Sequence, residues 1–241
     1  LYGELINVYG YNLEEGAKEL LAPNFYDNNK EIRIPLDPTL SPQENSQKFF
    51  DRYGKLKRTA EALDKLLQET KAEIDHLESI QNSLDIALSA DDLVQIKQEL
   101  TEYGFIKKNR SGKKEKIKSK PFHYLSSDGY DIYVGKNNYQ NDELTFKFAT
   151  GNDWWFHAKG MPGSHVIVKS KGEEMPDRVF EEAGMLAGFY SKGRDSDKIE
   201  IDYLQKKNVK KPAGSAPGFV VYYTNYSLTI HPDISHLKLI E

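Results

Sequence analysis

Apolar residues recur at helical spacing over the first half of the chain and alternate with polar ones over the second half. From Phe49 to Leu88 they stand four and three positions apart, which is the heptad spacing of a coiled-coil seam. The run Ser41-Pro42-Gln43-Glu44 before them supplies an N-cap, a proline at the first helical position and a capping-box carboxylate. We therefore predict a long helix from Pro42 to Leu88, with a break near Glu69 as the alternative. The seam consists of Phe49, Tyr53, Leu56, Ala60, Leu63, Leu67, Thr70, Ile74, Leu77, Gln81, Leu84 and Leu88.

The segments that flank this helix predict shorter elements. Residues 1–22 are expected to be helical and Glu31–Leu36 to form a short strand. A second helix is expected over Asp91–Tyr103, which is far too short to cover the seam. Because Leu1–Val8 resembles the end of a helix, we expect an upstream part of the protein. Either that upstream helix or a second copy of the chain is the predicted partner of the seam.

Beyond Pro121 the pattern changes to short runs of period two, which is typical of strands. One helix is expected among them, over Asp177–Ser191. This predicts an α+β chain, in which a long helical coiled-coil arm precedes a compact, mainly antiparallel sheet domain with one main helix. The expected domains are 1–104, a linker at 105–120, and 121–241. The predicted strands are Phe122–Leu125, Tyr130–Val134, Thr145–Ala149, Trp154–Ala158, His165–Val168, Lys198–Tyr203, Phe219–Tyr223 and Ser227–Ile230.

Charge is spread unevenly along the chain. Residues 105–120 carry 8 basic and 1 acidic side chains, although the formal net charge of the chain is −4. A lysine-rich connector of this kind is either a solvated linker or a strip that contacts RNA phosphates. The chain has no cysteine, which excludes disulfides and thiolate chemistry. No apolar run approaches the roughly 20 residues of a membrane span.

Several polar clusters in the second half could bind a ligand. Gly135-Lys136-Asn137-Asn138 offers backbone donors, a cation and two amides at one bend, as a phosphate cradle or as an ordinary turn. In the extended run Asp153–Lys159, residues Trp155, His157 and Lys159 share one face. They form either an aromatic stacking surface beside a cation or, alternatively, part of the core.

Catalytic and metal sites find little support in these residues. Ser164 and His165 are adjacent in a turn that enters a strand, so their side chains are expected to point to opposite faces and cannot form a triad by themselves. His157, His165 and Asp153 lack the spacing that metal ligands usually have. We therefore expect no enzyme activity, no metal and no cofactor.

Two basic turns follow regular elements. Lys192 and Arg194 follow the expected helix, and Lys206, Lys207, Lys210 and Lys211 follow a strand. The four lysines of the second turn surround Val209, which predicts a loop that is held in place and contacts phosphates; a solvated loop is the alternative.

These residues resemble a known family. Asp131–Asp142, Asp153–Lys159, Pro162–Val166 and Lys206–Pro212 are similar to the NFACT-R domain, and Leu36–Asn45 is similar to the start of the coiled-coil middle domain that precedes it. Together these segments identify the chain as resembling the C-terminal half of the RqcH/fibronectin-binding protein family, which is related to animal NEMF. The resemblance implies a ribosome quality-control factor that binds the large ribosomal subunit and tRNA, so that the ribosome adds an alanine tail to a stalled chain.

The resemblance also implies which residues face RNA and where the protein acts. A cytoplasmic location follows from the ribosomal role, and the family's older name implies the alternative of a surface adhesin that binds host fibronectin after non-classical export. The expected RNA-binding residues are Lys136, Asn137, Asn138, Asp153, Trp155, His157, Lys159, Ser164, His165, Arg194, Lys206, Lys207, Lys210 and Lys211.

Overall fold

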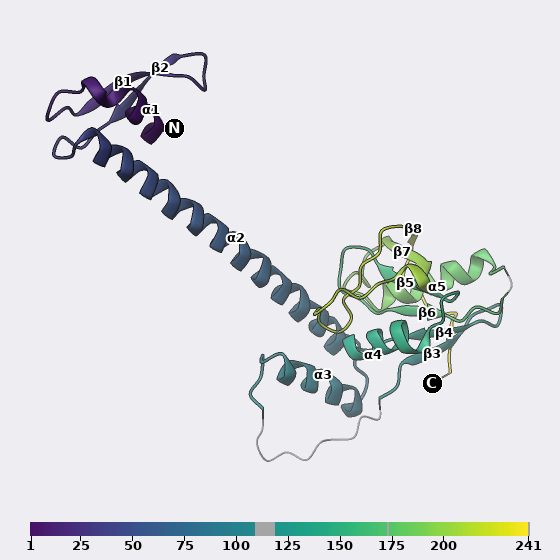
Figure 1. Cartoon of the computed structure of the whole chain (residues 1–241). Helices are drawn as coiled ribbons and strands as arrows, with labels where there is room; N and C mark the ends of the chain where they lie inside the picture. The colour runs from purple at the N-terminus through teal and green to yellow at the C-terminus, as the bar shows by residue number, and fades with distance from the viewer. Residues whose placement is uncertain (109–118, 173, 241) are drawn as a thin grey trace. The chain divides into compact units, whose positions relative to one another are not determined.

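The computed structural model of the chain describes residues 1–108, 119–172 and 174–240 (Figure 1). It contains two compact units, Leu1–Lys71 and Ala72–Glu241. Helix α2, Pro42–Ile86, begins in the first unit and ends in the second. The domain division expected from the sequence, with its linker at 105–120, stays a prediction, since the linker lies mostly outside the described residues.

The first unit is built around a β-hairpin. Strands β1, Glu19–Asn24, and β2, Lys30–Pro35, pair antiparallel and pack against α1, Tyr2–Tyr9, which is followed by the short η1, Gly10–Asn12. The prediction of a helix through residue 22 was therefore wrong beyond η1. Leu20 and Ala22 are both buried against Ile34 and α1, and this burial in the hairpin outweighs local helix propensity.

The start of α2 confirms the predicted capping. Ser41 Oγ accepts a hydrogen bond from the Glu44 N–H group at 3.3 Å, and Glu44 Oε2 accepts one from the Ser41 N–H group at 2.8 Å. Asn45, which is buried, donates to the carbonyl oxygens of Asp37 and Leu40 and so holds the preceding turn. The helix continues without a break to Ile86, close to the predicted end.

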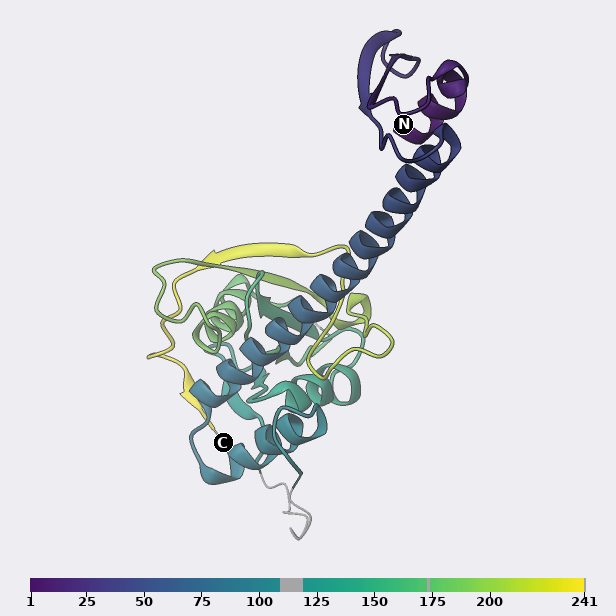
Figure 2. The ribbon, with the colours of Figure 1, turned by 90° about the vertical axis from the view of Figure 1, so that its left-hand side faces the viewer.

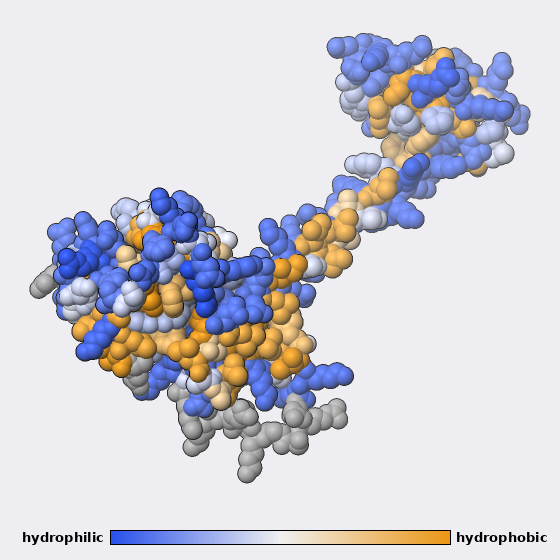
Figure 3. Space-filling view, turned by 180° about the vertical axis from the view of Figure 1, so that it is seen from behind, coloured by the Kyte–Doolittle hydropathy of each residue, from blue (hydrophilic) through white to orange (hydrophobic). Residues whose placement is uncertain are grey.

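Most of the predicted seam on α2 is open to solvent. Leu56, Leu63 and Leu67 are 59%, 56% and 62% exposed, and Figure 3 shows apolar side chains on the surface of the helix. Burying apolar side chains is the main source of coiled-coil stability. The identity of the partner that would cover the seam stays a prediction.

The second unit contains a seven-stranded antiparallel sheet in the order β8-β7-β5-β6-β4-β3-β9. Helix α5, Asp177–Phe189, packs on one face over the larger core cluster, as its buried stripe predicted. The predicted fold class is confirmed. The strands are β3 (Phe122–Leu125), β4 (Asp131–Val134), β5 (Trp154–Ala158), β6 (Val166–Val168), β7 (Ile199–Gln205), β8 (Tyr226–Ile230) and β9 (Lys238–Leu239).

The opposite face of the sheet is covered by α4, Asn138–Glu143, by the π-helical turn η2, Leu144–Phe148, and by the segment after β7. Two predicted strands were wrong here. The run at 145–149 forms η2, in which the Ala149 N–H group reaches the Leu144 carbonyl at 2.8 Å and both side chains pack on the sheet. The run at 219–223 contributes a single bridge, between Lys210 and Val221.

Candidate nucleic-acid interface

We define the basic loop as Lys206–Lys211, directly after β7. It is held in place by packing against the core and by hydrogen bonds to a neighbouring segment. Residues Lys206–Asn208 form the short helix η3, and Val209 is 5% exposed because it packs in the core under the loop. The N–H group of Lys210 donates to the Val221 carbonyl at 2.9 Å, and Val221 returns a bond at 2.8 Å. The lysines at 207, 210 and 211 are exposed, so the loop presents its charges on an ordered support.

Two of these lysines converge on one aromatic ring. The Nζ atoms of Lys206 and Lys211 lie 5.8 Å and 5.9 Å from the centre of the Phe146 ring. Lys211 also forms an ion pair with Asp142, whereas Lys207 and Lys210 form no ion pair with a described residue. Charges that lack an internal partner are available to phosphates. The lysine-rich connector, the other predicted phosphate contact, lies outside the described residues at 109–118.

The bend that was predicted to cradle phosphate makes its polar contacts inside the protein. Asn137 is 1% exposed; its Oδ1 atom caps α4 by accepting the Gln140 N–H group at 3.0 Å, and its Nδ2 donates to Gln95 Oε1 at 2.9 Å. Lys136 Nζ lies 3.2 Å from Asp92 Oδ1 and over the ring of Phe122. Because these polar atoms bind partners within the chain, the expectation that the bend cradles phosphate is not supported.

Asn138 forms further hydrogen bonds of this kind, one of them with the last turns of α2. Its Nδ2 donates to Glu99 Oε1 at 2.9 Å and to Ser79 Oγ at 2.7 Å. Glu99 lies on α3, Ala90–Glu102, and also pairs with His76 of α2 at 2.7 Å. Figure 2 shows α3 and the last turns of α2 beside α4. We call this polar contact between α2, α3 and α4 the helix clamp; it consists of His76, Ser79, Asp92, Gln95, Glu99, Lys136, Asn137 and Asn138.

The side chains of Asp153 and Ser164 also form hydrogen bonds within the domain. Burial raises the pKa of Asp153, but bonds from Lys169 and from the N–H groups of Ser170 and Thr150 outweigh that effect and hold it below its usual value. Ser164 is 1% exposed and donates to the Gly135 carbonyl at 2.6 Å. Both side chains hold loops in place, and both are too deeply buried to contact RNA in this structure.

Trp155 does not form the predicted stacking surface with His157 and Lys159. It is 0% exposed, because the segment after β7 covers that face of the sheet. The His157 ring stacks on it at 5.6 Å, and the His165 ring meets it edge-on at 5.1 Å. Lys159 is exposed and pairs with Glu200 at 3.3 Å. The alternative, that Trp155 belongs to the core, is the one that the structure shows.

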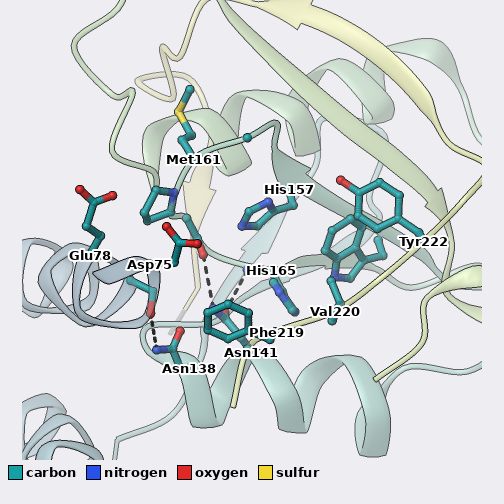
Figure 4. A pocket seen from close by; sticks show the side chains of 16 residues that line it. Asp75, Glu78, Asn138, Asn141, His157, Met161, His165, Phe219, Val220 and Tyr222 are labelled. Carbon is teal, nitrogen blue, oxygen red and sulfur yellow. Dashed lines mark hydrogen bonds between the residues drawn. The ribbon is translucent and has the colours of Figure 1, made fainter. Parts of the chain in front are cut away.

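Trp155, His157 and His165 instead line a pocket of about 340 Å³ (Figure 4). Burial lowers the pKa of His157 to about 4, and burial together with the nearby His157 lowers the pKa of His165 well below its usual value. Both imidazoles are therefore neutral at pH 7. His165 is held by a 2.7 Å hydrogen bond between its Nδ1 and Thr145 Oγ1.

The pocket has a rim that the sequence analysis missed. Asp75 and Glu78 reach it from the last turns of α2, and Phe219 and Tyr222 reach it from the segment after β7 (Figure 4). In the sequence the two acids are ordinary charges on a helix, and no local spacing links them to Phe219 and Tyr222, which lie more than 140 positions later. Glu78 forms an ion pair with Lys192 at 3.0 Å. Lys192 lies in the turn after α5, and the same turn contains the half-buried Arg194.

Two further observations concern metal binding and membrane spans. Within residues 1–108, 119–172 and 174–240, no three His, Asp or Glu side chains gather as metal ligands would. Over the same residues, no helix has the length and apolar character that crossing a bilayer requires.

Comparison with known families matches the two parts of the chain separately. Residues 1–119 match the model of the NFACT N-terminal and middle domains, and residues 120–223 match that of the NFACT protein RNA binding domain. A solved structure titled as the C-terminal part of the fibronectin/fibrinogen-binding protein from Streptococcus suis is 41% identical, with a TM-score of 0.73, and the match covers 80% of this chain and 77% of that one.

Curated relatives agree with these matches. The Rqc2 homolog RqcH of Streptococcus pneumoniae is 40% identical over 96% of this chain, and that of Bacillus subtilis is 36% identical over 97%. In both cases the chain spans 41% of the relative's length. The ribosome quality control complex subunit NEMF homolog of Drosophila melanogaster is 24% identical over 79% of this chain and 18% of its own length. The chain belongs to the NFACT family.

Proposed function

We propose that this chain is the RNA-binding part of a ribosome quality-control factor that binds the large ribosomal subunit and tRNA and supports alanine tailing of stalled nascent chains. The names of the RqcH and NEMF relatives and the match to the NFACT RNA binding domain support the quality-control role. The observation that carries RNA binding is the basic loop, because Lys207 and Lys210 are exposed, ordered and without internal ion-pair partners among the described residues.

In this proposal the chain binds and the ribosome catalyses. A binding role in the cytoplasm requires phosphate contacts and a specific surface, and it requires no nucleophile or metal. The basic loop supplies the phosphate contacts, at Lys206, Lys207, Lys210 and Lys211. Of the buried residues predicted from the sequence to face RNA, Trp155 packs in the same core cluster as Val209 under the loop, and the Asp153 carbonyl accepts a hydrogen bond from the Lys206 N–H group.

The test is a salt series of binding to purified large ribosomal subunits and to tRNA. The variant changes Lys206, Lys207, Lys210 and Lys211 to alanine. The matched control removes the same charge from Lys18, Lys30, Lys55 and Lys71, which are exposed lysines of the first unit. We expect the slope of log affinity against log salt to fall by about 0.9 for each lost contact with a duplex phosphate. Equal slopes for both variants would contradict the role of the loop.

A second candidate function comes from the name of the Streptococcus suis relative, which is described as binding fibronectin and fibrinogen. If this chain binds fibronectin through its own surface, binding should persist in the variant that lacks the four loop lysines. Surface plasmon resonance with immobilised fibronectin measures this directly. Loss of fibronectin binding together with RNA binding would contradict a separate surface and place both on the basic loop.

A further inference from the structure

The face of the sheet opposite α5 is covered over β5 and β6 and partly open over β3 and β4. On this face, Ile167 of β6 stands opposite Trp155 of β5 on one side and Tyr133 of β4 on the other. Tyr133 in turn stands opposite His123 of β3. Trp155 and Ile167 are 0% exposed, whereas the side chains that β3 and β4 turn to this face are half-buried. The row therefore runs from the covered core to a part of the sheet that solvent reaches.

The open end of this row carries aromatic rings. The His123 and Tyr133 rings are stacked, with centres 4.5 Å apart and planes 4° from parallel, and the Phe148 ring of η2 lies 4.7 Å from Tyr133 at a steep angle. Phe148 is 41% exposed, and the Nε2–H group of His123 donates to Asp131 Oδ1 at 2.8 Å, which orients the imidazole. Solvated positions of a sheet usually carry polar side chains, so rings gathered here indicate a binding surface. We call His123, Tyr133 and Phe148 the ring platform.

Cations surround the ring platform. Lys169 Nζ lies 4.7 Å from the centre of the Phe148 ring and forms an ion pair with Asp153. Lys147 precedes Phe148 in the chain, and Lys238 lies on the edge strand β9 beside β3. Both lysines are exposed, and neither forms an ion pair with a described residue. Their charges are therefore available to an anionic ligand.

The ring platform is continuous with the basic loop. The carboxylate of Asp153 pairs with Lys169 beside the platform, and its carbonyl oxygen accepts a hydrogen bond from the Lys206 N–H group at 2.8 Å. The Lys207 N–H group donates to the Gly151 carbonyl at 3.2 Å, two residues before Asp153. An RNA strand whose phosphates follow the loop lysines thus meets the rings on the adjoining surface.

We propose that the ring platform binds unpaired nucleotides of RNA, whose bases stack on the exposed parts of its rings while Lys147 and Lys169 hold the flanking phosphates. Aromatic side chains beside cations bind single strands with little sequence preference, because every base has a flat aromatic face. In a duplex those faces are covered by neighbouring bases, so a duplex meets this surface through its phosphates alone. The proposal rests on RNA binding as proposed above and adds the class of RNA, namely single-stranded loops and ends.

Phe148→Leu tests the stacking, because it removes the ring and keeps an apolar side chain at an exposed position. Fluorescence anisotropy with a short labelled single strand of RNA should show affinity weakened about fivefold or more, the lower end of what one stacked base contributes. The slope of log affinity against log salt should not change, since no charge is lost. Phe25→Leu is the matched control, since Phe25 is 43% exposed in the first unit, and it should bind like the unaltered chain.

The same strand annealed to its complement separates stacking from charge. Phe148→Leu should bind this duplex as the unaltered chain does, which also shows that the variant is folded. Lys147→Ala should lower the salt slope for the single strand by about 0.7, the value for one lost phosphate contact, and Lys71→Ala, at an exposed position of the first unit, should not. An equal loss of single-strand and duplex binding in Phe148→Leu would overturn the proposal.

The two proposals fail in different ways. Single-strand binding that is equally tight in Phe148→Leu and Phe25→Leu would overturn the ring platform and leave RNA binding by the basic loop intact. Single-strand binding that depends on Phe148, in a chain that binds neither ribosomal subunits nor tRNA, would support the platform and contradict the proposed function.

Discussion

Asn138 of α4 donates a hydrogen bond to Glu99 of α3 at 2.9 Å, and both side chains are buried. This bond joins the RNA-binding domain to the helices that precede it. Residues that looked like a ligand cradle in the sequence thus form an internal contact. Its strength can be measured.

Replacing Asn138 by alanine should destabilise the second unit by about 1–3 kcal/mol, because Glu99 and Ser79 would each lose a buried partner. Urea unfolding followed by tryptophan fluorescence measures the change. Asn152→Ala, at an exposed position without a hydrogen bond from its side chain to a described residue, is the control and should change the free energy of unfolding little. Equal stability of the two variants would show that the bonds from Asn138 to Glu99 and Ser79 contribute no net stability.

Gly218 approaches Asn138 closely in a backbone conformation with φ +80°, and an added Cβ would lie 2.7 Å from Asn138 Oδ1. Gly218→Ala should therefore lower the melting temperature for two reasons, left-handed backbone strain of about 1 kcal/mol and this close contact. Gly214→Ala separates them, since Gly214 has φ +74° and no atom within 4 Å of the added Cβ. Gly214→Ala should cost the strain alone, and an equal loss in both variants would contradict the close contact.

Stability should fall as the pH is lowered from 6.5 toward 4. In the unfolded chain a histidine takes up a proton near pH 6.5, whereas burial lowers the pKa of His157 in the fold to about 4. Between these values the unfolded state binds more protons, so acid favours unfolding by up to about 1.4 kcal/mol per pH unit for each such histidine.

His157→Gln should flatten this dependence, and His231→Gln, which changes an exposed histidine, should leave it as it is. Melting temperatures across the pH range measure both variants. An unchanged slope in His157→Gln would assign the acid sensitivity to other groups, first among them His165.

The open seam on α2 should drive self-association when no other helix covers it. Sedimentation velocity of the chain should show a concentration-dependent dimer, because Leu56, Leu63 and Leu67 would bury their side chains between two copies. Changing Leu63 and Leu67 to glutamate should return the chain to a monomer. Gln68→Glu, beside the seam, should not, and a chain that stays monomeric at all concentrations would favour an upstream helix as the partner.

The sequence predicted the elements whose pattern is local. The start of α2, the buried face of α5 and the strands β3 and β5 depend on capping or periodicity within one segment, and they appear where expected. Thr145 shows the limit. Its run alternates like a strand, but the Thr145 hydroxyl binds His165, and Leu144 and Ala149 pack under one π-helical turn, contacts that no local pattern reveals.

The sequence predicted one part of the candidate site, the basic loop, and missed the other part, the pocket. The basic loop was predicted because its lysines and Val209 are neighbours in the chain. The pocket was missed because Asp75 and Trp155 meet only after α2 docks on the sheet domain. Polar residues such as Asn137 were assigned to RNA because composition does not distinguish a surface amide from one that is satisfied inside the protein.

The last turns of α2 carry Asp75 and Glu78 on the pocket rim and His76 and Ser79 in the helix clamp. These four residues span little more than one helical turn. Any rotation or axial slip of the helix would therefore change the mouth of the pocket and the clamp together. One turn of helix therefore sets the geometry of both, as a single tooth engages two gears.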